Sequence, residues 1–358
     1  MSSLKSTIGS IAVLSRKLPT RSARDYILDK RRNIAYIYRM KTMTKNEFDA
    51  DELNLIKLAQ EYNDDDKARR LLESILWPNG AVCPHCKNDG KQKTISKLTQ
   101  KAGSKSAVRK GVYFCGACRK QFTVTVKTVF ESSHVKISAW VMAWFLICSS
   151  KKGMSAHQLH RMLGVTYKTA WFMAHRIRHA MATDLKTAPP LANTCEADES
   201  FFHSFENTQN KGIVALVLES DGQARTRVIA SVTAKNVGKF MDECVSKTAT
   251  VNTDEHVAYK LALKNHKRHD RVNHSRFEYA RHNPDGTVSH VNTCESFFSL
   301  IKRGVFGNFH CVSKEHLAKY ASEFELRWNT RFLTDGARLV NSMPMIEDKR
   351  LLYRQPAN

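Results

Sequence analysis

Residues 194–202, TCEADESFF, begin the part of the sequence that decides the fold. Two more β-rich runs follow, GIVALVLES at 212–220 and ARTRVIASV at 224–232, with the turn-forming SDGQ between them. Runs rich in β-branched and aromatic residues that end at turn-forming residues are typical of strands. The sequence therefore predicts three consecutive strands in this region.

Strands then alternate with helices. An amphipathic helix is predicted at 234–245, a strand at 249–255 and a second helix at 256–266. A short strand around RVNHS and a loop containing NPDGT come before a helix that carries Glu295. Three consecutive strands followed by strand–helix alternation predict a mixed α/β sheet of the RNase H-like class, which we assign to residues 194–335.

Three acidic residues fall where these predicted elements end or meet. Asp198 lies in the first strand, Asp254 at the end of a later strand, and Glu295 in the helical stretch 290–310, HVNTCESFFSLIKRGVFGNFH. Phosphodiester cleavage with two metal ions needs carboxylates that converge on ions about 4 Å apart. Strand ends about 5 Å apart, together with one helix, can supply this convergence. A single acid in an apolar helix is, however, also an ordinary solvated residue.

Neighbouring acids compete for the same roles. Glu196 shares the strand face of Asp198, whereas Glu199 points to the other face, and the pattern favours Asp198 over Glu196 only slightly. Asp254 has a similar rival in Glu255, and an Asp that ends a strand before a helix is also an ordinary N-cap or turn former. The residue pattern alone leaves both choices open.

The charge balance indicates a polyanionic partner. The 358 residues include 57 Lys and Arg against 34 Asp and Glu, which gives a net charge of +23. Such a field favours nucleic acid or an anionic membrane surface. The richest apolar run, AWVMAWFLIC at 139–148, is too short to span a bilayer. We therefore expect nucleic acid and no membrane, although composition does not distinguish DNA from RNA.

Four of the nine cysteines form two CxxC pairs, CPHC at Cys83 and Cys86 and CGAC at Cys115 and Cys118. Two such knuckles can complete one tetrahedral zinc site, so we predict a zinc ribbon with structural Zn²⁺. A redox pair or free core thiols are the alternatives. The basic segment 87–111 between the pairs is expected to form a loop. The odd number of cysteines argues against a disulfide framework and for a reducing, cytoplasmic compartment.

A helix-turn-helix is predicted between the ribbon and the α/β domain. The ribbon's last strand is expected at 121–130, and an apolar helix follows at 138–150. The next helical stretch breaks at Gly164, and another begins with Thr166 as its cap. The predicted DNA contacts are Lys168, Thr169, Arg176 and Arg178. An ordinary helical hairpin with solvated arginines is the alternative, and Trp140, Trp144 and Trp171 are expected to be core residues.

The chain ends and linkers complete the organisation. The first 42 residues have no acid before Asp25, a composition shared by transit peptides and equally produced by a misassigned start; we favour a start at Met43. At the other end, the amphipathic stretch 316–332 contains Arg327, Asn329 and Arg331, which we expect to pack on the sheet rather than on DNA. The predicted parts are an N-terminal extension (1–42), a helical segment (43–78), the zinc ribbon (79–130), the helix-turn-helix (131–185), a linker (186–193), the α/β domain (194–335) and a tail (336–358).

These motifs, in this order, resemble those of the insertion-sequence DDE transposases that carry an N-terminal zinc ribbon, the ISXO-type branch. The resemblance covers CPHC, CGAC, SAHQLHRMLGVTYKTAWFMAHRIR, EADES, NTDEHVAY and the 290–310 block, from about residue 45 to residue 335. It implies a catalytic triad of Asp198, Asp254 and Glu295, with Lys302 as the basic residue that follows the Glu. It thereby selects Asp198 over Glu196.

The resemblance also implies a mechanism and partners. Two Mg²⁺ or Mn²⁺ ions at the triad would support cleavage at the element ends and transfer of the 3′-OH strand into target DNA, with Lys302 near a phosphate. The expected partners are terminal inverted repeats, target DNA and further copies of the chain in a synaptic homo-oligomer, on the nucleoid of a bacterial cytoplasm. The alternatives are an inactive or domesticated DNA-binding protein and an RNase H-type nuclease.

Overall fold

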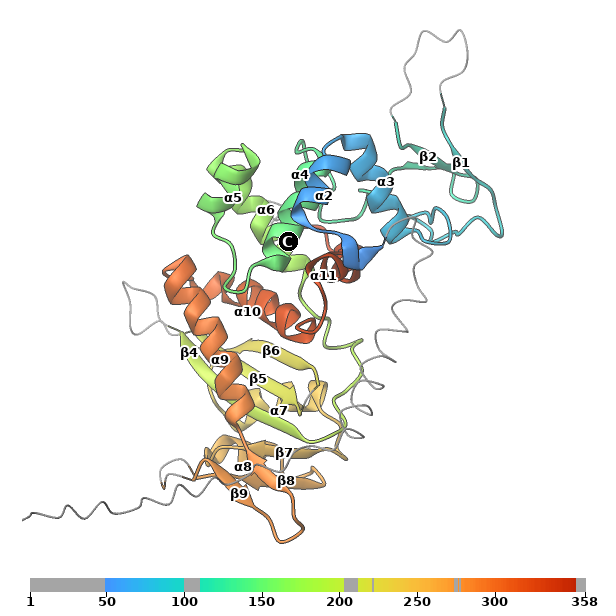
Figure 1. Ribbon diagram of the computed structural model, residues 1–358. Helices are drawn as coiled ribbons and strands as arrows, with labels where there is room; N and C mark the ends of the chain where they lie inside the picture. The colour runs from blue at the N-terminus through green and yellow to red at the C-terminus, as the bar shows by residue number, and fades with distance from the viewer. Residues whose placement is uncertain are drawn as a thin grey trace, which may run out of the picture. The chain divides into compact units, whose positions relative to one another are not determined.

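The computed structural model describes residues 49–99, 110–202, 212–220, 222–273, 276 and 278–351 (Figure 1). The contacts divide the chain into Met1–Lys45 and Asn46–Asn358, and all described residues belong to the second unit. The predicted extension at 1–42, with its leader-like composition, and the start expected at Met43 lie outside the described residues. In the described part of the chain, every helix is too short or too polar to span a bilayer.

The first described elements are a 3₁₀ turn at Ala50–Glu52 and the helices α2 (Leu55–Glu61) and α3 (Asp65–Leu76). A small antiparallel sheet follows, with β1 (Ile95–Lys97), β2 (Tyr113–Cys115) and β3 (Gln121–Phe122) in that order.

Two expectations for the ribbon were wrong. The segment predicted as a loop contains β1, and the strand predicted to run to residue 130 ends at Phe122. Beyond Phe122 the backbone forms turns, in which Thr128 Oγ1 donates to the Thr125 carbonyl at 2.7 Å.

Three helices form the next region: α4 (Ile137–Ser149), α5 (Ala156–Leu163) and α6 (Tyr167–Ala180). Helix α5 ends at Gly164, whose φ of 64° is left-handed and therefore suits glycine. Helix α6 begins at Thr166, whose hydroxyl accepts a hydrogen bond from the Thr169 N–H at 3.2 Å. Both predicted helix ends are confirmed. The side chains of Trp140 and Trp144 are buried, as expected.

The α/β region contains a mixed five-stranded sheet with the order β6-β5-β4-β7-β8. Strands β4, β5 and β6 form an antiparallel meander, whereas β7 lies parallel to β4 and β8 lies parallel to β7. The prediction of a mixed sheet is confirmed. The strand expected around residues 271–275 lies slightly earlier in the chain. The strand bounds are β4 (Cys195–Phe202), β5 (Gly212–Glu219), β6 (Ala224–Ile229), β7 (Thr250–Thr253) and β8 (Arg268–Arg271).

Alternating side chains of the sheet bury its two faces under different helices. Ala215 and Val217 pack with α7 (Ala234–Cys244) and α8 (Val257–Ala262). Val214 and Leu216 pack on the opposite face, against α9 (Asn292–Gly304) and α10 (Lys314–Asn329). Figure 1 shows α9 lying across the sheet. This alternation follows from the two-residue period of a strand.

A β-hairpin stands where we predicted a loop. Strands β9 (Ala280–His282) and β10 (Val288–His290) pair antiparallel, with Val288 opposite His282. The predicted NPDGT turn joins them, since the Asn283 N–H donates to the Thr287 carbonyl at 2.9 Å. The hairpin leads directly into α9, which ends in a π-helical turn at Val305–Phe309.

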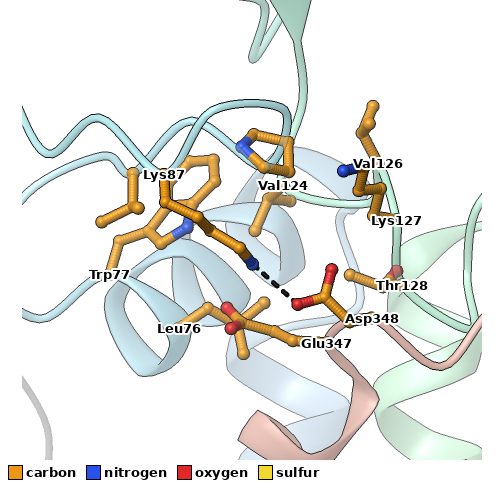
Figure 2. Close-up of a pocket in the computed structure, with 11 residues that line it drawn as sticks. Leu76, Trp77, Lys87, Val124, Val126, Lys127, Thr128, Glu347 and Asp348 are labelled. Atoms are coloured by element: carbon orange, nitrogen blue, oxygen red, sulfur yellow. Dashed lines mark hydrogen bonds and ion pairs between the residues drawn. The ribbon is translucent and has the colours of Figure 1, made fainter.

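The C-terminal segment packs against the N-terminal helices. The predicted domain boundary at 336 falls inside α11 (Asp335–Ser342), which contacts α4; the Trp144 indole N–H donates to Ser342 Oγ at 2.7 Å. Further on, Lys87 Nζ lies 2.7 Å from a carboxylate oxygen of Asp348, at a pocket beside Trp77 (Figure 2). Part of the predicted tail therefore belongs to the core, and its last described residues contact the ribbon.

Candidate metal centres and active site

Four sulfur atoms come together in the ribbon. The Sγ atoms of Cys83, Cys86, Cys115 and Cys118 all lie within 4.8 Å of one another. Each knuckle turns in the same way: the N–H of the residue after each CxxC pair, Lys87 or Arg119, donates to the first cysteine's carbonyl at 2.8 Å. A compact set of four thiolate ligands fits tetrahedral Zn²⁺. The predicted ligands therefore form one cluster.

The sheet places the two aspartates side by side. Strands β4 and β7 pair in parallel, and Ala197 lies opposite Thr253 at the end of this pairing. The next residues along the two strands are Asp198 and Asp254. Neighbouring parallel strands are about 4.8 Å apart, so the register alone brings both residues to adjacent positions on neighbouring strands.

Helix α9 is attached to the same strand through Glu196. Its Oε2 accepts hydrogen bonds from the Thr293 and Cys294 N–H groups at 2.8 and 3.3 Å, and its Oε1 accepts one from Thr293 Oγ1 at 2.5 Å. The Glu196 side chain is only 1% exposed. A carboxylate at a helix N-terminus satisfies N–H groups that otherwise lack partners and complements the helix dipole.

This contact brings Glu295 to the aspartates. Asp198 lies two residues after Glu196 on the strand, and Glu295 lies two residues after Thr293 on the helix. Both oxygens of Glu196 are engaged with the helix, so Glu196 positions α9 and Asp198 remains as the strand's acid on this face. The sequence signal for this role was the period-two spacing of Glu196 and Asp198, which we had weighed only as competition.

The charges of Asp254 and Glu295 both act on Asp198, so the three acids lie in one neighbourhood. Burial, followed by the negative charges of Glu199, Asp254 and Glu295, raises the pKa of Asp198 to about 7. Clustered carboxylates of this kind fit a divalent cation, which would offset their repulsion. Among the described residues only the cysteine cluster has its ligand atoms within 4.8 Å, so the acids stand further apart than the sulfur atoms.

The competing acids have other contacts. Glu199 points to the opposite face, as predicted, where the Tyr259 hydroxyl donates to its carboxylate at 2.8 Å. The N-cap of α8 is His256, not Asp254, whose Oδ1 instead accepts the His256 N–H at 3.0 Å. Asp254 is therefore not the N-cap, but this contact is that of a turn-forming Asp, the other half of the structural alternative.

Basic residues follow Glu295 on α9. Lys302 is exposed, two helical turns after Glu295. The cavity beside Glu295 is lined by Asn292, Ser296, Ser299, Leu300 and Arg303 rather than by Lys302. Arg303 therefore lines the same surface hollow of α9 as Glu295, and sequence reasoning missed it.

The predicted DNA contacts on α6 divide into two groups. Lys168 is exposed and Thr169 is half-buried near the start of the helix. Arg176 and Arg178 are buried. Arg176 donates to the Leu351 and Glu131 carbonyls at 3.2 and 3.3 Å.

Arg178 is only 1% exposed; it forms an ion pair with Glu323 of α10 and donates to the Met154 carbonyl at 3.0 Å. DNA contact through Arg176 and Arg178 is therefore contradicted, because both guanidinium groups are enclosed by protein.

The predicted packing of α10 on the sheet is confirmed. Asn329 bridges to the edge strand β6: its Oδ1 accepts the Ala224 N–H at 2.7 Å and its Nδ2 donates to the Ala224 carbonyl at 3.1 Å. Arg331 donates to the Gly222 carbonyl at 3.2 Å, and Arg327 donates to the Ile147 carbonyl of α4 at 2.8 Å. Helix α10 therefore connects the sheet to the N-terminal helices.

Two family models match the chain. The ISXO2-like transposase domain matches residues 191–329, and the transposase zinc-ribbon domain matches residues 63–121. The chain therefore contains one segment similar to an ISXO2-like transposase domain and one similar to a transposase zinc ribbon.

Comparisons with individual proteins gave two further matches. An uncharacterized protein in transposable element ISH50 of Halobacterium salinarum is 28% identical over 73% of this chain and 90% of its own length. A chain in the structure of the simian T-cell lymphotropic virus intasome with PP2A regulatory subunit B56 gamma matches at 11% identity and a TM-score of 0.26, over 52% of this chain and 65% of that chain.

Proposed function

We propose that this chain is a DDE transposase that cleaves DNA at the ends of an insertion sequence and joins the 3′ strand to target DNA in a metal-dependent reaction. The observation that carries the proposal is the register of β4 and β7, which puts Asp198 beside Asp254. The Glu196 contact adds Glu295 from α9. The packing of β4, β7 and α9 does not itself require three acidic side chains to lie close together.

The residues divide the work as follows. Asp198, Asp254 and Glu295 would hold two Mg²⁺ or Mn²⁺ ions, which activate the attacking oxygen and stabilise the leaving oxygen. Glu196 keeps Glu295 in place. Lys302, and Arg303 beside it, would contact phosphates near the scissile bond. The four cysteines would hold Zn²⁺ and stabilise the ribbon.

We further propose that the sheet is RNase H-like and that α5 and α6 form a helix-turn-helix. The meander β4–β6 followed by parallel strands supports the first assignment, and the short turn between Gly164 and Thr166 supports the second. Lys168 and Thr169 then remain as candidate contacts to DNA. The domain boundaries at 79–130, 131–185 and 194–335 remain predictions.

The proposed partners are terminal inverted repeats, target DNA and other copies of the chain, since two DNA ends must be held together. The net charge of +23 supports DNA binding in a cytoplasmic, nucleoid-bound setting. A light-scattering measurement on paired end DNA tests the assembly. A dimer or larger complex is expected, and monomers alone would contradict this part of the proposal.

Asp254→Asn is the direct test of activity. In a cleavage and strand-transfer assay on the element's ends with Mg²⁺, we expect Asp254→Asn to lose at least about 100-fold, because a neutral amide binds Mg²⁺ poorly. Glu199→Gln is the matched control: it removes an acid adjacent to Asp198 but on the opposite face, and should keep most activity. Equal activity in both variants would show that the assigned acids are wrong.

A non-catalytic DNA-binding protein is the second candidate. The basic charge and the ribbon would suffice for that role. The test uses wild-type protein that has been verified to contain zinc. If this protein binds the element ends but does not cleave them, the DNA-binding role is favoured over the transposase.

A further inference from the structure

A row of polar side chains crosses the sheet next to the proposed carboxylate site. The β4–β7 and β7–β8 registers place Glu196, Asn252 and Asp270 side by side, and paired residues point to the same face of a sheet. Asp198 and Asp254 lie two residues further along the chain, which is about 6.6 Å at 3.3 Å per residue. The row therefore lies on the α9 face of the sheet, one step away from the aspartates.

Helix α9 depends on this row for its position. Its N-cap residue is Val291, whose side chain has no group that can accept a hydrogen bond. Glu196 supplies the acceptor from β4 instead, for the Thr293 and Cys294 N–H groups. Contacts with the sheet, rather than the local sequence, therefore determine where the helix starts.

Asp270 holds the segment that leads into α9. Its Oδ2 accepts a hydrogen bond from Ser289 Oγ at 2.9 Å, and Ser289 is the central residue of β10, three residues before α9 begins. Ser289 is only 1% exposed, so water cannot easily replace this bond. A hydrogen bond to a charged acceptor is also stronger than one between neutral groups.

Two neighbouring side chains fix the direction of this bond. Asn283 Nδ2 donates to Ser289 Oγ at 2.8 Å, and Arg268 Nε lies 2.7 Å from Asp270 Oδ2. A serine hydroxyl has one hydrogen to donate. Because Ser289 accepts from Asn283, its own hydrogen is directed to Asp270.

The residue after Ser289 contacts the other end of the row. His290 Nδ1 lies 3.4 Å from Glu196 Oε1, and β10 packs against β7 and β8. Two successive residues of β10 therefore contact acids on β8 and β4. Through Glu196 alone the start of α9 would still pivot, whereas a second attachment at Asp270 fixes the direction in which the helix leaves the sheet.

We propose that Asp270 is a positioning residue for Glu295 and acts through Ser289. Glu295 lies in the first turn of α9, so a rotation of the helix start displaces its carboxylate from Asp198 and Asp254. Magnesium requires nearly ideal ligand geometry, and groups that orient its ligands affect the affinity for metal. This inference rests on the proposed function and names the residues that keep its third acid in place.

The test compares two variants with a matched control. Ser289→Ala removes the hydroxyl, and Asp270→Ala removes its acceptor. Asp285→Ala is the control: Asp285 also forms an ion pair with Arg268, but its other hydrogen bonds go to Thr287 at the exposed end of the hairpin. It therefore weakens the hairpin without removing the attachment of Ser289. Asp270→Asn keeps an acceptor oxygen and should lose less than Asp270→Ala.

Amide hydrogen exchange of the metal-free full chain reports the attachment of α9 directly. The Thr293 and Cys294 N–H groups should exchange at least about tenfold faster in Ser289→Ala and Asp270→Ala than in the wild type, because the helix start opens locally more often. They should keep the wild-type rate in Asp285→Ala. Unchanged rates in α7 separate this local opening from a general loss of stability.

Metal binding gives the second measurement. Mn²⁺ affinity, followed by electron paramagnetic resonance, should fall at least about tenfold in Ser289→Ala and Asp270→Ala, the size expected when a group that orients a ligand is lost. Cleavage of the element end at saturating Mn²⁺ should return to within about threefold of the wild type, because the acids themselves are unchanged. Asp285→Ala should match the wild type in both measurements.

Three other outcomes are informative. Wild-type exchange of Thr293 and Cys294 in Ser289→Ala would overturn the inference. Equal losses of Mn²⁺ affinity in Asp270→Ala and Asp270→Asn, with full affinity in Ser289→Ala, would also overturn it, because Asp270 would then bind the metal itself. If the wild type binds Mn²⁺ no better than Asp198→Asn, the metal site of the proposed function fails, and the exchange rates still decide this inference.

Discussion

The cysteine cluster and the proposed carboxylate site of this chain are assembled in opposite ways. Each pair of sulfur ligands comes from one short knuckle, and all four sulfur atoms lie within 4.8 Å. The proposed carboxylate site takes Asp198 from β4, Asp254 from just after β7 and Glu295 from α9, and the charges of its members oppose one another. The cysteine cluster is therefore a folding element, whereas the carboxylates form a site that the rest of the fold must hold together until a cation offsets their repulsion.

Removing zinc should have the largest effect. Structural zinc contributes about 10–16 kcal/mol in small zinc-binding peptides, so chelation or Cys115→Ser should unfold the ribbon. Trp77 packs against Tyr113 and Phe122 with ring centroids 5.4 and 5.8 Å apart, so tryptophan fluorescence should report the loss. Cys311→Ser, at an exposed cysteine outside the cluster, should keep one zinc per chain. If the ribbon stays folded without zinc, the cysteine cluster is not needed for folding, and this difference from the carboxylate site does not exist.

Glu196→Ala should have the next largest effect. The change leaves the Thr293 and Cys294 N–H groups without their buried acceptor and should lower the free energy of unfolding by about 2–3 kcal/mol. Glu196→Gln keeps an acceptor oxygen and should lose less. Urea unfolding measures the stability, and Mn²⁺ titration should show weaker binding in Glu196→Ala. Full Mn²⁺ affinity in the alanine variant would mean that α9 is positioned by other contacts.

Asp198→Asn should have the smallest effect, and in the opposite direction. The change removes a half-buried charge that is repelled by Glu199, Asp254 and Glu295, so the metal-free chain should gain about 1 kcal/mol of stability. Mn²⁺ should raise the melting temperature of the wild type and not that of the variant. A loss of stability in metal-free Asp198→Asn would show that the carboxylates do not repel one another as the structure indicates.

Local patterns predicted local features well. The cap at Thr166, the break at Gly164 and the three strands of the meander depend on residues that are neighbours in sequence, and the structure confirms them. The three-residue strands β9 and β10 were missed, because such short segments carry too little periodicity to distinguish a hairpin from a loop.

The main error of the sequence analysis was to expect charged side chains on the surface that are in fact buried. Arg178 was expected on the DNA-binding surface because arginine on a helix is usually solvated. Its partner Glu323 lies 145 residues away in the sequence, and no local pattern reports that pairing. The same limitation hid the role of Glu196, whose hydrogen-bond partners on α9 are 97 and 98 residues away.

The sequence by itself determined the four-cysteine cluster and the mixed α/β region, because residue type and spacing along the chain specify them. It left Asp198 and Glu196, and Asp254 and Glu255, as alternatives, between which only the family resemblance selected. The tertiary structure alone decided that Glu196 on β4 binds α9, which arginines are enclosed and which basic residue shares a surface hollow with Glu295. Those outcomes depend on strand register and on how α9 and α10 pack. Both are set by contacts between distant segments that fix each side chain to one face.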